Sequence, residues 1–359
     1  MRAVMMRSFG PPRVLEAVAV ADPRPGPGEV VVDVEFASVT FVETQIRAGR
    51  APRPEMLPAL PAILGNGVGG TVAEIGAGVD RGLTGRRVIS SLTGTGGYAQ
   101  RAVTSAERLV EVPAGVPVRD ATALLADGRT ALALIDRARP CPGDTVLVEA
   151  AAGGVGTLLV QLARAAGARV VALASGERKL RVTRELGADV AIDYGDGDWA
   201  RLVRDAVGGV DVAFDGVGGD IGLAAFGLLR PGGRFCPFGM ASGSFAPVPG
   251  ELARAREVTV LAGAASDPAK LKDLVRVVLG EAAAGRIRPV VGQEFELARA
   301  ADAHAAIEAR ATIGKTLLAA AGRIRPVVGQ EFELTRAADA HAAIEARATI
   351  GKTLLVIPS

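Results

Sequence analysis

The pattern of hydrophobic and polar positions changes its character along the chain. From residue 1 to about Leu125, apolar runs such as Gly28–Thr40 and Gly85–Ser91 are separated by glycine and proline, which indicates a β-rich region. From Ala126 to about Ala265, apolar runs alternate with amphipathic stretches of helical period. This alternation is typical of an α/β fold with a parallel sheet and crossover helices.

The alternating region can be divided into elements. The pattern predicts strands over Asp144–Ala150, Ala168–Ser175 and Val210–Gly218, and helices over Gly156–Gly167 and Glu177–Gly187. A further helix is predicted over Pro268–Gly285, because Pro stands near its start and Gly at its end.

The end of the chain contains a 37-residue tandem duplication. Ala282–Leu318 and Ala319–Leu355 are identical at every position except one, where the first copy has Ala298 and the second has Thr335. Repeat architectures need three or more units that drift apart in sequence, so these two copies do not indicate a solenoid. They indicate a duplication of one terminal piece, or an artefact of how the sequence was made or recorded.

Each copy reads as strand, helix, strand. In the first copy these are Ile287–Gly292, Arg299–Thr312 and Lys315–Leu318. We expect one copy to complete a domain and the other to be surplus. The first copy is the expected occupant, because it follows the preceding helix without a loop to close. The second copy is the alternative, since the 37-residue excursion that it requires has a loop entropy that grows only logarithmically with length.

Bulk properties narrow the function classes. The chain has 359 residues, 49% of them hydrophobic and 22% charged, which favours a folded protein of two domains. The formal charge of +2 gives no electrostatic sign of nucleic-acid or membrane binding. The first twenty residues lack the apolar core of a signal peptide, and no apolar run is long enough to span a bilayer. We therefore expect a cytoplasmic protein.

Cysteine and histidine are scarce. The two cysteines, Cys141 and Cys236, form no metal-like cluster, and the two histidines, His304 and His341, are the same residue in the two copies. A zinc site needs three or four converging ligands, so we expect no metal. A Ser-His-Asp hydrolase is not indicated either.

A glycine-rich turn carries the chemistry. After the strand Thr145–Ala150, the residues Ala151, Gly153 and Gly156 fill the three positions of the dinucleotide fingerprint, with Ala in place of the first Gly. Such a turn lets backbone approach a pyrophosphate at a helix N-terminus. The strand and helix on either side favour dinucleotide binding over a turn that only packs a helix on the sheet.

The end of the second strand indicates which dinucleotide. An NAD enzyme places an acid there to hold the ribose 2′-OH, whereas this strand ends in Ala174-Ser175-Gly176. Arg178 and Lys179 follow, and cations suit a 2′-phosphate. Glu177 is a competing signal, although an acid also suits a first helical turn. The sequence favours NADPH; the alternative for the two cations is a solvated helix face.

These motifs resemble a known family. The stretches that carry the resemblance are "LPAILGNGVGGTVAEIGAGV", "GGYAQ", "DGRTALAL", "PGDTVLVEAAAGGVGTLLVQLARAAGARVV", "LGADVAIDY", "VDVAFDGVGG", "LRPGGRFCPFGMASG" and "AADAHAAIEARATIGKTLLVIP". Together they resemble the zinc-independent medium-chain dehydrogenases/reductases of the quinone oxidoreductase (zeta-crystallin-like) group.

The resemblance implies a fold with an inserted domain. A Rossmann dinucleotide-binding domain at 126–265 would lie within a GroES-like, β-rich catalytic domain made of 1–125 and 266–359. It also implies a homodimer, the most common closed assembly.

The resemblance further implies a set of NADPH contacts. They are Gly153, Gly154 and Val155 at the pyrophosphate, Ser175, Lys179 and Tyr194 around the 2′-phosphate, Thr130, Phe238 and Gly239 near the nicotinamide half, and Arg310 or Arg347 elsewhere on the cofactor. For Tyr194, an aromatic side chain that covers the sheet is the alternative.

The chain departs from the family in two places. Gly65-Asn66-Gly67 stands where the zinc-dependent branch has a ligand histidine. Thr40–Gln45 stands where quinone reductases often have "N-F-x-D-x-Y", so the amide and the tyrosine ring are missing. Thr40 and Gln45 are candidates for the substrate pocket; plain loop structure is the alternative.

The implied reaction is hydride transfer from NADPH to a quinone or a small conjugated enone. Backbone N–H groups, or the hydroxyl of Thr40 or Thr130, could stabilise the negative charge that develops on the acceptor oxygen. Tyr98 is available in the pocket, although packing fits it better, and water could supply the proton. The alternatives are an enoyl reductase of a biosynthetic, polyketide-type intermediate, and a non-enzymatic NADPH-binding structural or sensor protein.

Overall fold

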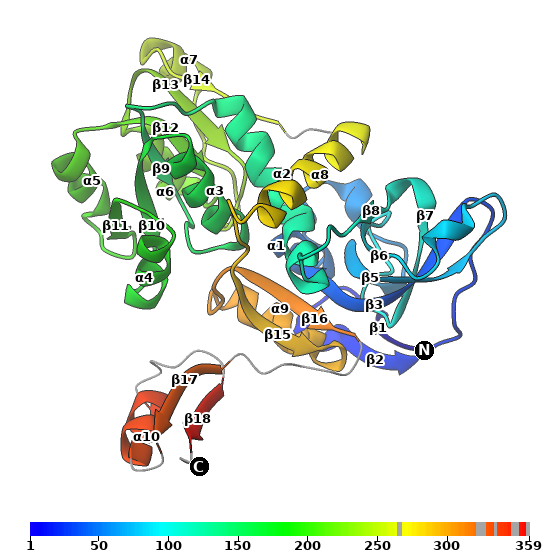
Figure 1. The fold of residues 1–359 in the computed structure, drawn as a ribbon. Coiled ribbons are helices and arrows are strands. Elements are labelled where there is room, and N and C mark those ends of the chain that lie inside the picture. The colour runs from blue at the N-terminus through cyan, green and yellow to red at the C-terminus, as the bar shows by residue number, and fades with distance from the viewer. Residues whose placement is uncertain (264–267, 321–327, 334–335, 346–351, 357–359) are drawn as a thin grey trace. The chain divides into compact units, whose positions relative to one another are not determined.

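The computed structural model describes residues 1–263, 268–320, 328–333, 336–345 and 352–356 (Figure 1). It contains two compact units. Met1–Gly85, Leu92–Thr104 and Val291–Ser359 form the first unit, and Arg86–Ser91 and Ser105–Val290 form the second. Both ends of the chain therefore contribute to the first unit. The predicted boundary at residue 125 falls within a helix, and the proposed domain limits stay a prediction.

The first unit consists mainly of strands. Its elements are β1 (Arg2–Met6), β2 (Leu15–Ala19), β3 (Glu29–Val39), α1 (Phe41–Arg47), β4 (Ala62–Ile63), β5 (Gly67–Ile75), β7 (Arg101–Ser105), β15 (Val291–Glu296), α9 (Ala300–Glu308), β16 (Lys315–Ala319), β17 (Val328–Glu333), α10 (Ala337–Glu345) and β18 (Lys352–Val356). One sheet has the order β2-β1-β4, and another contains β15-β16-β3-β5, with β7 paired to β3. The apolar runs of β1 and β3 supply much of the core of this unit, around Met6, Val34 and Tyr98.

The second unit is a doubly wound α/β structure. Its elements are β6 (Arg87–Ser91), β8 (Val110–Glu111), α2 (Val118–Ala138), β9 (Thr145–Val148), α3 (Gly154–Ala165), β10 (Arg169–Ala174), α4 (Glu177–Glu185), β11 (Val190–Asp193), α5 (Trp199–Val207), β12 (Val210–Asp215), α6 (Gly219–Phe226), β13 (Leu229–Pro237), α7 (Gly250–Ala255), β14 (Thr259–Val260) and α8 (Pro268–Ala283). Its sheet has the order β11-β10-β9-β12-β13-β14, and each of these pairs is parallel. This is the strand order of the dinucleotide-binding fold, which confirms the predicted fold class.

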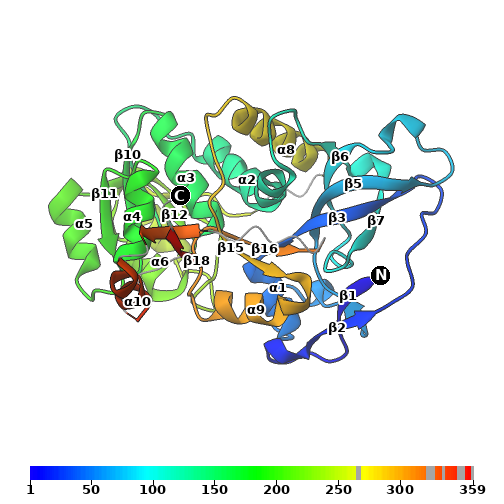
Figure 2. The same ribbon diagram turned by 60° about the horizontal axis from the view of Figure 1, so that its bottom comes forward.

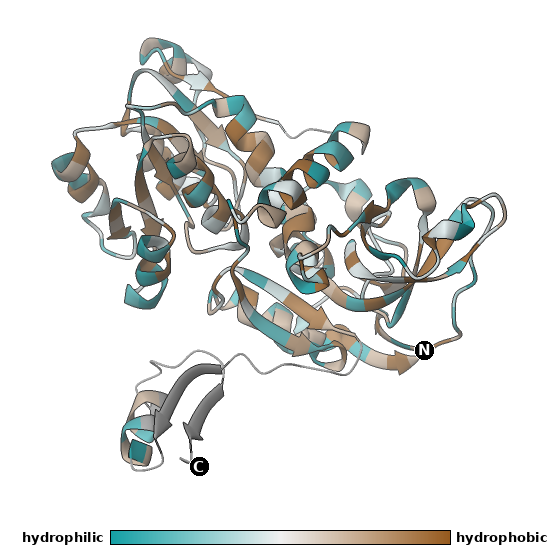
Figure 3. Cartoon of the chain, in the orientation of Figure 1, coloured by the Kyte–Doolittle hydropathy of each residue, from teal (hydrophilic) through white to brown (hydrophobic). Residues whose placement is uncertain are grey.

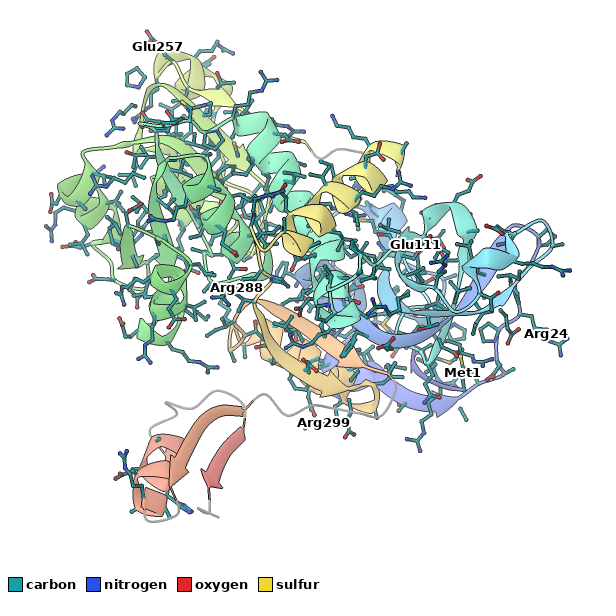
Figure 4. The ribbon with its side chains drawn as sticks, in the orientation of Figure 1. Met1, Arg24, Glu111, Glu257, Arg288 and Arg299 are labelled. Carbon is teal, nitrogen blue, oxygen red and sulfur yellow. The ribbon has the colours of Figure 1, made fainter. Side chains whose placement is uncertain are left out.

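Residues on this sheet alternate between two cores. Val146 and Val148 of β9 pack in one hydrophobic cluster, whereas Leu147 between them packs in another. Successive side chains of a strand point to opposite faces, so a sheet covered on both faces needs apolar residues at every position. Figure 3 shows these strands largely in the hydrophobic colour, and in Figure 4 side chains fill the space between strands and helices. None of the described helices is both long and apolar enough to cross a membrane.

The first copy of the duplication completes the sheet of the first unit. Strand β16 pairs antiparallel with β3, in a register that puts Thr316 opposite Val39. Leu297, Ala300 and Leu318 of this copy lie in the core of the unit. The copy that follows α8 directly is thus the one that occupies this position, as expected.

The second copy repeats the local structure of the first. Strands β17 and β18 pair in parallel with the same register shift as β15 and β16. Helix α10 packs on the β17–β18 pair as α9 packs on the β15–β16 pair (Figures 1 and 2). The ion pair of Arg299 with Asp302, 2.7 Å long, recurs as Arg336 with Asp339 at 2.8 Å.

Two predicted boundaries within the copies were wrong. The first strand was expected over Ile287–Gly292 but spans β15, Val291–Glu296, because Pro289 lacks the N–H that a ladder needs and the pairing with β16 starts at Val291. The helix was expected to reach Thr312 but ends at Glu308, since Arg310 has a left-handed φ of 53°.

Deleting Ala319–Leu355 is expected to leave a folded, cofactor-binding protein. The deletion keeps β15, α9 and β16 as far as Leu318 and joins Leu318 to Val356, which takes the position of Ala319 at the end of the strand. Thermal unfolding and cofactor titration would check this.

A chain that stops after Ala320 is the matched control. Ala319 and Ala320 are buried, at 5% and 4% exposed, and the deletion replaces them with Val356 and Ile357. If overpacking matters, the truncated chain should be more stable than the deletion variant by about 1 kcal/mol. Failure of both proteins to fold would contradict the assigned role of the first copy.

Candidate functional site

The turn between β9 and α3 is built by close backbone contacts. Ala150 has a left-handed φ of 45°, and the N–H of Gly153 donates to its carbonyl at 2.8 Å. A Cβ on Gly156 would lie 2.3 Å from that same carbonyl oxygen and 2.7 Å from the Cα of Ala151. Glycine is required at this position, because only backbone stands in the way. The helix can thus start directly beneath the turn.

The first turn of α3 offers backbone donors to an anion. Gly153 is its N-cap and has no side chain to cap it. The first N–H groups of a helix lack intrahelical acceptors and carry the positive end of the helix dipole. Ala151 is fully buried and Val155 half-buried, so Gly153 and Gly154 are the residues through which backbone can approach a pyrophosphate.

Asp127 of α2 lies next to this helix end, which the sequence did not reveal. A Cβ on Gly154 would be 1.9 Å from Asp127 Oδ2, so the carboxylate lies against the Gly154 backbone. It stands one helical turn before Thr130, whose hydroxyl donates to the carbonyl of Ala126 at 2.8 Å. An acidic side chain therefore lies beside the N-terminal end of α3.

The end of β10 gathers the candidate 2′-phosphate residues. Lys179 Nζ donates to Ser175 Oγ at 3.4 Å across the first turn of α4. Arg178 is partly buried, and its Nε is enclosed without a hydrogen-bond partner in the described part of the chain. Burial lowers the pKa of the Arg178 guanidinium. A partly buried guanidinium whose Nε has no partner among the described residues fits an anionic ligand.

A carboxylate also stands at this strand end, although it comes from the neighbouring strand. Asp193, the last residue of β11, accepts from the N–H of Gly176 and from the N–H of Gly195, both at 2.7 Å. These bonds hold the ends of β10 and β11 together. Tyr194 follows it, is half-buried, and packs against the sheet core, as in the alternative given above for this residue.

The turn after β12 is joined to the turn after β13. The carbonyl of Asp215 accepts from the N–H groups of Phe238 and Gly239, at 2.8 and 3.1 Å. A Cβ on Gly216 would lie 2.7 Å from the Phe238 ring, and a Cβ on Gly239 would lie 2.4 Å from the Gly216 carbonyl. Phe238 and Gly239 are thus fixed at the end of the sheet where β9 and β12 also end.

The candidate pocket residues of the first unit surround a buried glutamate. Thr40 is the N-cap of α1 and forms a capping box with Glu43, whose Oε2 accepts from the Thr40 hydroxyl at 3.0 Å. The N–H of Asn66 donates to Glu43 Oε1 at 2.8 Å. Burial raises the pKa of Glu43. The short helix α1 replaces the loop that was the alternative for this stretch, and the T-x-x-E pattern was the signal for it.

Tyr98 belongs to the same cluster. It is 0% exposed, and its hydroxyl donates to Glu43 Oε2 at 3.2 Å and lies 3.0 Å from His304 Nε2. Burial and the charge of Arg47 lower the pKa of His304 to about 3, so this histidine is neutral. Tyr98 is therefore held inside the core of the first unit, and its place in the substrate pocket stays a prediction. Gln45 is half-buried, and its amide donates to Thr44 Oγ1 at 3.1 Å.

Two candidate cofactor contacts remain, Arg310 and Arg347. Arg310 is an exposed residue of the first unit, just after α9. Arg347 lies outside the described residues. In the described ranges of the chain, no group of three or more His, Cys, Asp or Glu side chains is arranged to hold a metal ion.

The structure thus collects most of the predicted cofactor residues in the second unit. Ala151, Gly153, Gly154, Val155 and Gly156 surround one turn; Ser175, Arg178, Lys179 and Tyr194 lie at the next two strand ends; and Phe238 and Gly239 lie beyond β12. The sequence reasoning missed the acids Asp127, Glu149 and Asp215. For the last two, the available signal was an acidic residue at the end of an otherwise apolar strand.

Family models match three parts of the chain. The alcohol dehydrogenase GroES-like domain matches residues 26–114, and two zinc-binding dehydrogenase models match residues 154–279 and 316–355. The last match runs from β16 through the second copy of the duplication.

Whole-length relatives are similar to the chain as well. A probable quinone oxidoreductase of Schizosaccharomyces pombe is 35% identical over 88% of this chain and 96% of its own length. A 2-haloacrylate reductase of a Burkholderia species is 34% identical over 89% of this chain and 98% of its own. The solved structure of Escherichia coli quinone oxidoreductase complexed with NADPH superposes with a TM-score of 0.82 at 27% identity, over 89% of this chain and all of that one.

Proposed function

The chain belongs to the quinone oxidoreductase group of the medium-chain dehydrogenases/reductases, and we propose that it reduces a small quinone or conjugated enone with NADPH and without a metal ion. The observation that carries the proposal is the set of residues at the adjacent carboxyl ends of β9 and β10 in the second unit. A glycine turn with close backbone contacts stands beside two cations, one of which has an enclosed Nε without a partner among the described residues.

The residues present fit NADPH. Backbone at Gly153 and Gly154 and the N-terminus of α3 would hold the pyrophosphate. Ser175, Arg178 and Lys179 would hold the 2′-phosphate, because guanidinium and ammonium groups form charge-assisted hydrogen bonds with phosphate. When bound, the nicotinamide supplies the hydride. Phe238 and Gly239 would position that half of the cofactor.

The hydroxyls of Thr40 and Thr130 are not available to stabilise the negative charge on the reduced acceptor, because both already donate a hydrogen bond elsewhere. The Thr40 hydroxyl donates to Glu43, and the Thr130 hydroxyl donates to a carbonyl of its own helix. Each would have to leave its acceptor before it could donate to a developing oxyanion. We therefore assign this role to backbone N–H groups, and the proton to water. Thr40 and Gln45 then shape the acceptor pocket.

NADPH oxidation with a panel of acceptors tests the function. We expect turnover with benzoquinones or with short enones, in a protein exhaustively treated with a chelator as well as in untreated protein. A rate lost on chelation and restored by zinc would contradict the metal-free mechanism. Binding of NADPH without turnover of any acceptor would support a structural or sensor role instead.

An alkene conjugated to a carbonyl group is the second candidate acceptor class. A relative with 34% identity is named 2-haloacrylate reductase, and acrylates are alkenes conjugated to a carboxyl group. Enoyl thioesters in the same panel of acceptors distinguish an enoyl reductase of a biosynthetic intermediate from a reductase of quinones or simple enones. Faster turnover of enoyl thioesters than of quinones and simple enones would favour a biosynthetic intermediate as the substrate.

A further inference from the structure

Two buried carboxylic acids lie at the ends of neighbouring central strands. Glu149 follows β9 directly, and Asp215 is the last residue of β12. Both are 0% exposed. The two strands are adjacent in the sheet at the point where the strand order reverses, which is where sheets of this kind bind their ligands.

Two of the four carboxyl oxygens of the pair accept backbone hydrogen bonds, and the other two are buried without a donor from the described chain. The N–H of Val217 donates to Glu149 Oε2 at 3.2 Å and to Asp215 Oδ1 at 3.0 Å, and the N–H of Gly218 donates to Asp215 Oδ1 at 2.6 Å. The other two oxygens, Glu149 Oε1 and Asp215 Oδ2, are buried and have no hydrogen-bond donor from the rest of the described chain. The N–H of Val217, which donates to both acids, places the two carboxyl groups next to each other. One proton between them satisfies both oxygens, because an ionised carboxylate can only accept.

We propose that Glu149 and Asp215 share one proton and act as a positioning pair for the cofactor-binding turns, so that loss of this proton weakens cofactor binding. The part about the cofactor rests on the proposed function. The shared proton itself rests only on the geometry of the two acids.

The pair is connected to both turns that line the expected nicotinamide end. The side chain of Asp215 holds the N–H groups of Val217 and Gly218, and its backbone carbonyl holds those of Phe238 and Gly239. On the far side, a Cβ on Gly222 of α6 would lie 2.5 Å from Asp215 Oδ2, so the carboxyl cannot retreat toward that helix. Repulsion between two ionised acids would therefore be relieved by movement of the two turns.

The surroundings of the pair favour the protonated form. Burial raises the pKa of Glu149 well above its usual range, and the neighbouring charge of Asp215 raises it further. The packed elements carry further titratable groups, among them Cys236 of β13, whose pKa burial raises to about 12, the exposed Asp220 of α6, the exposed Arg164 of α3, and Asp127, Arg129 and Arg137 of α2. Asp215 is the charged group that acts on Glu149.

A raised pKa in the folded state fixes the sign of the pH effect. The folded protein holds the proton where the unfolded chain releases it, so the stability is fully present below the ordinary glutamate pKa of 4.5. It is lost as the pH rises through the folded pKa. Cofactor affinity should fall over the same range.

The variant Glu149→Gln tests the proposal, because an amide N–H can replace the shared proton at every pH. Unfolding of the apo protein should be less sensitive to alkaline pH in Glu149→Gln than in the wild type. The infrared band of a buried protonated carboxyl group should disappear. By fluorescence titration, the wild-type Kd for NADPH should rise by about tenfold for each pH unit above the folded pKa, whereas that of Glu149→Gln should stay constant.

The double variant Glu149→Gln/Asp215→Asn is the matched control. In either single variant, one amide N–H donates to the remaining carboxylate. In the double variant, two amide NH2 groups face each other and neither finds an acceptor in the pair. We expect the double variant to be less stable than the sum of the single effects implies. Additive effects, or a carboxyl band that persists in Glu149→Gln, would overturn the shared proton. A change in the stability profile without a change in the pH dependence of the Kd would overturn the positioning role. If no NADPH binds at all, the proposed function fails, while the infrared and stability measurements still decide the shared proton.

Discussion

Replacing Gly156 by alanine is expected to abolish tight NADPH binding and to destabilise the second unit. The added Cβ would lie 2.3 Å from the Ala150 carbonyl oxygen and 2.7 Å from the Ala151 Cα. Both are backbone atoms that are held by the sheet, so α3 must move away from the turn. We expect a loss of about 1–3 kcal/mol in the free energy of unfolding. The Kd for NADPH should rise by more than the roughly tenfold that 1.4 kcal/mol represents, since the helix end is itself the pyrophosphate site.

Urea unfolding and fluorescence titration measure the two effects. The matched control is Gly280→Ala in α8, where, apart from the adjacent helix backbone, no atom of the described residues lies within 4 Å of the added Cβ. This control should be neutral or more stable by up to about 1 kcal/mol, because glycine is a poor helix former. Equal behaviour of the two variants would show that the turn does not need the close approach.

Replacing Lys179 by alanine is expected to weaken NADPH binding by about 1–3 kcal/mol and to leave NADH binding almost unchanged. Lys179 lies one turn into α4, and its ammonium group donates to Ser175 at the strand end. A 2′-phosphate in this place would gain a charge-assisted hydrogen bond that NADH cannot make.

The control for charge alone is Arg184→Ala on the same helix. Arg184 is exposed and paired with Glu177, so its loss should change neither affinity. Titrations with both cofactors check the prediction. Equal losses of affinity for NADPH and NADH in Lys179→Ala would rule out the assignment of this residue to the 2′-phosphate.

The sequence predicted those parts of the site that are encoded within a few consecutive residues. The turn at Ala151–Gly156 needs a strand before it and a helix after it, and all three are visible in one stretch of the chain. The same holds for Ser175, Arg178 and Lys179 at the following strand end. The fold class was confirmed because the period of hydrophobic residues is a local property as well.

Contacts between distant stretches were beyond this reasoning. Glu149 and Asp215 meet because β12 lies beside β9, and only the strand order reveals that. Tyr98, Glu43 and His304 come from three separate parts of the chain and meet in the core of the first unit. The capping box of Thr40 and Glu43 is different, because its T-x-x-E pattern lies within four consecutive residues. The short helix α1 could therefore have been predicted from the sequence.

The pairing of β16 with β3 has a consequence for the order in which the protein can form during its synthesis. Thr316 lies opposite Val39, so the sheet of the first unit lacks an inner strand until most of the chain has left the ribosome. The second unit is complete at Val290, before that strand has been made. Domains generally fold as units during translation. The nucleotide-binding unit can therefore form first, while one edge of β3 stays unpaired until β16 has been translated.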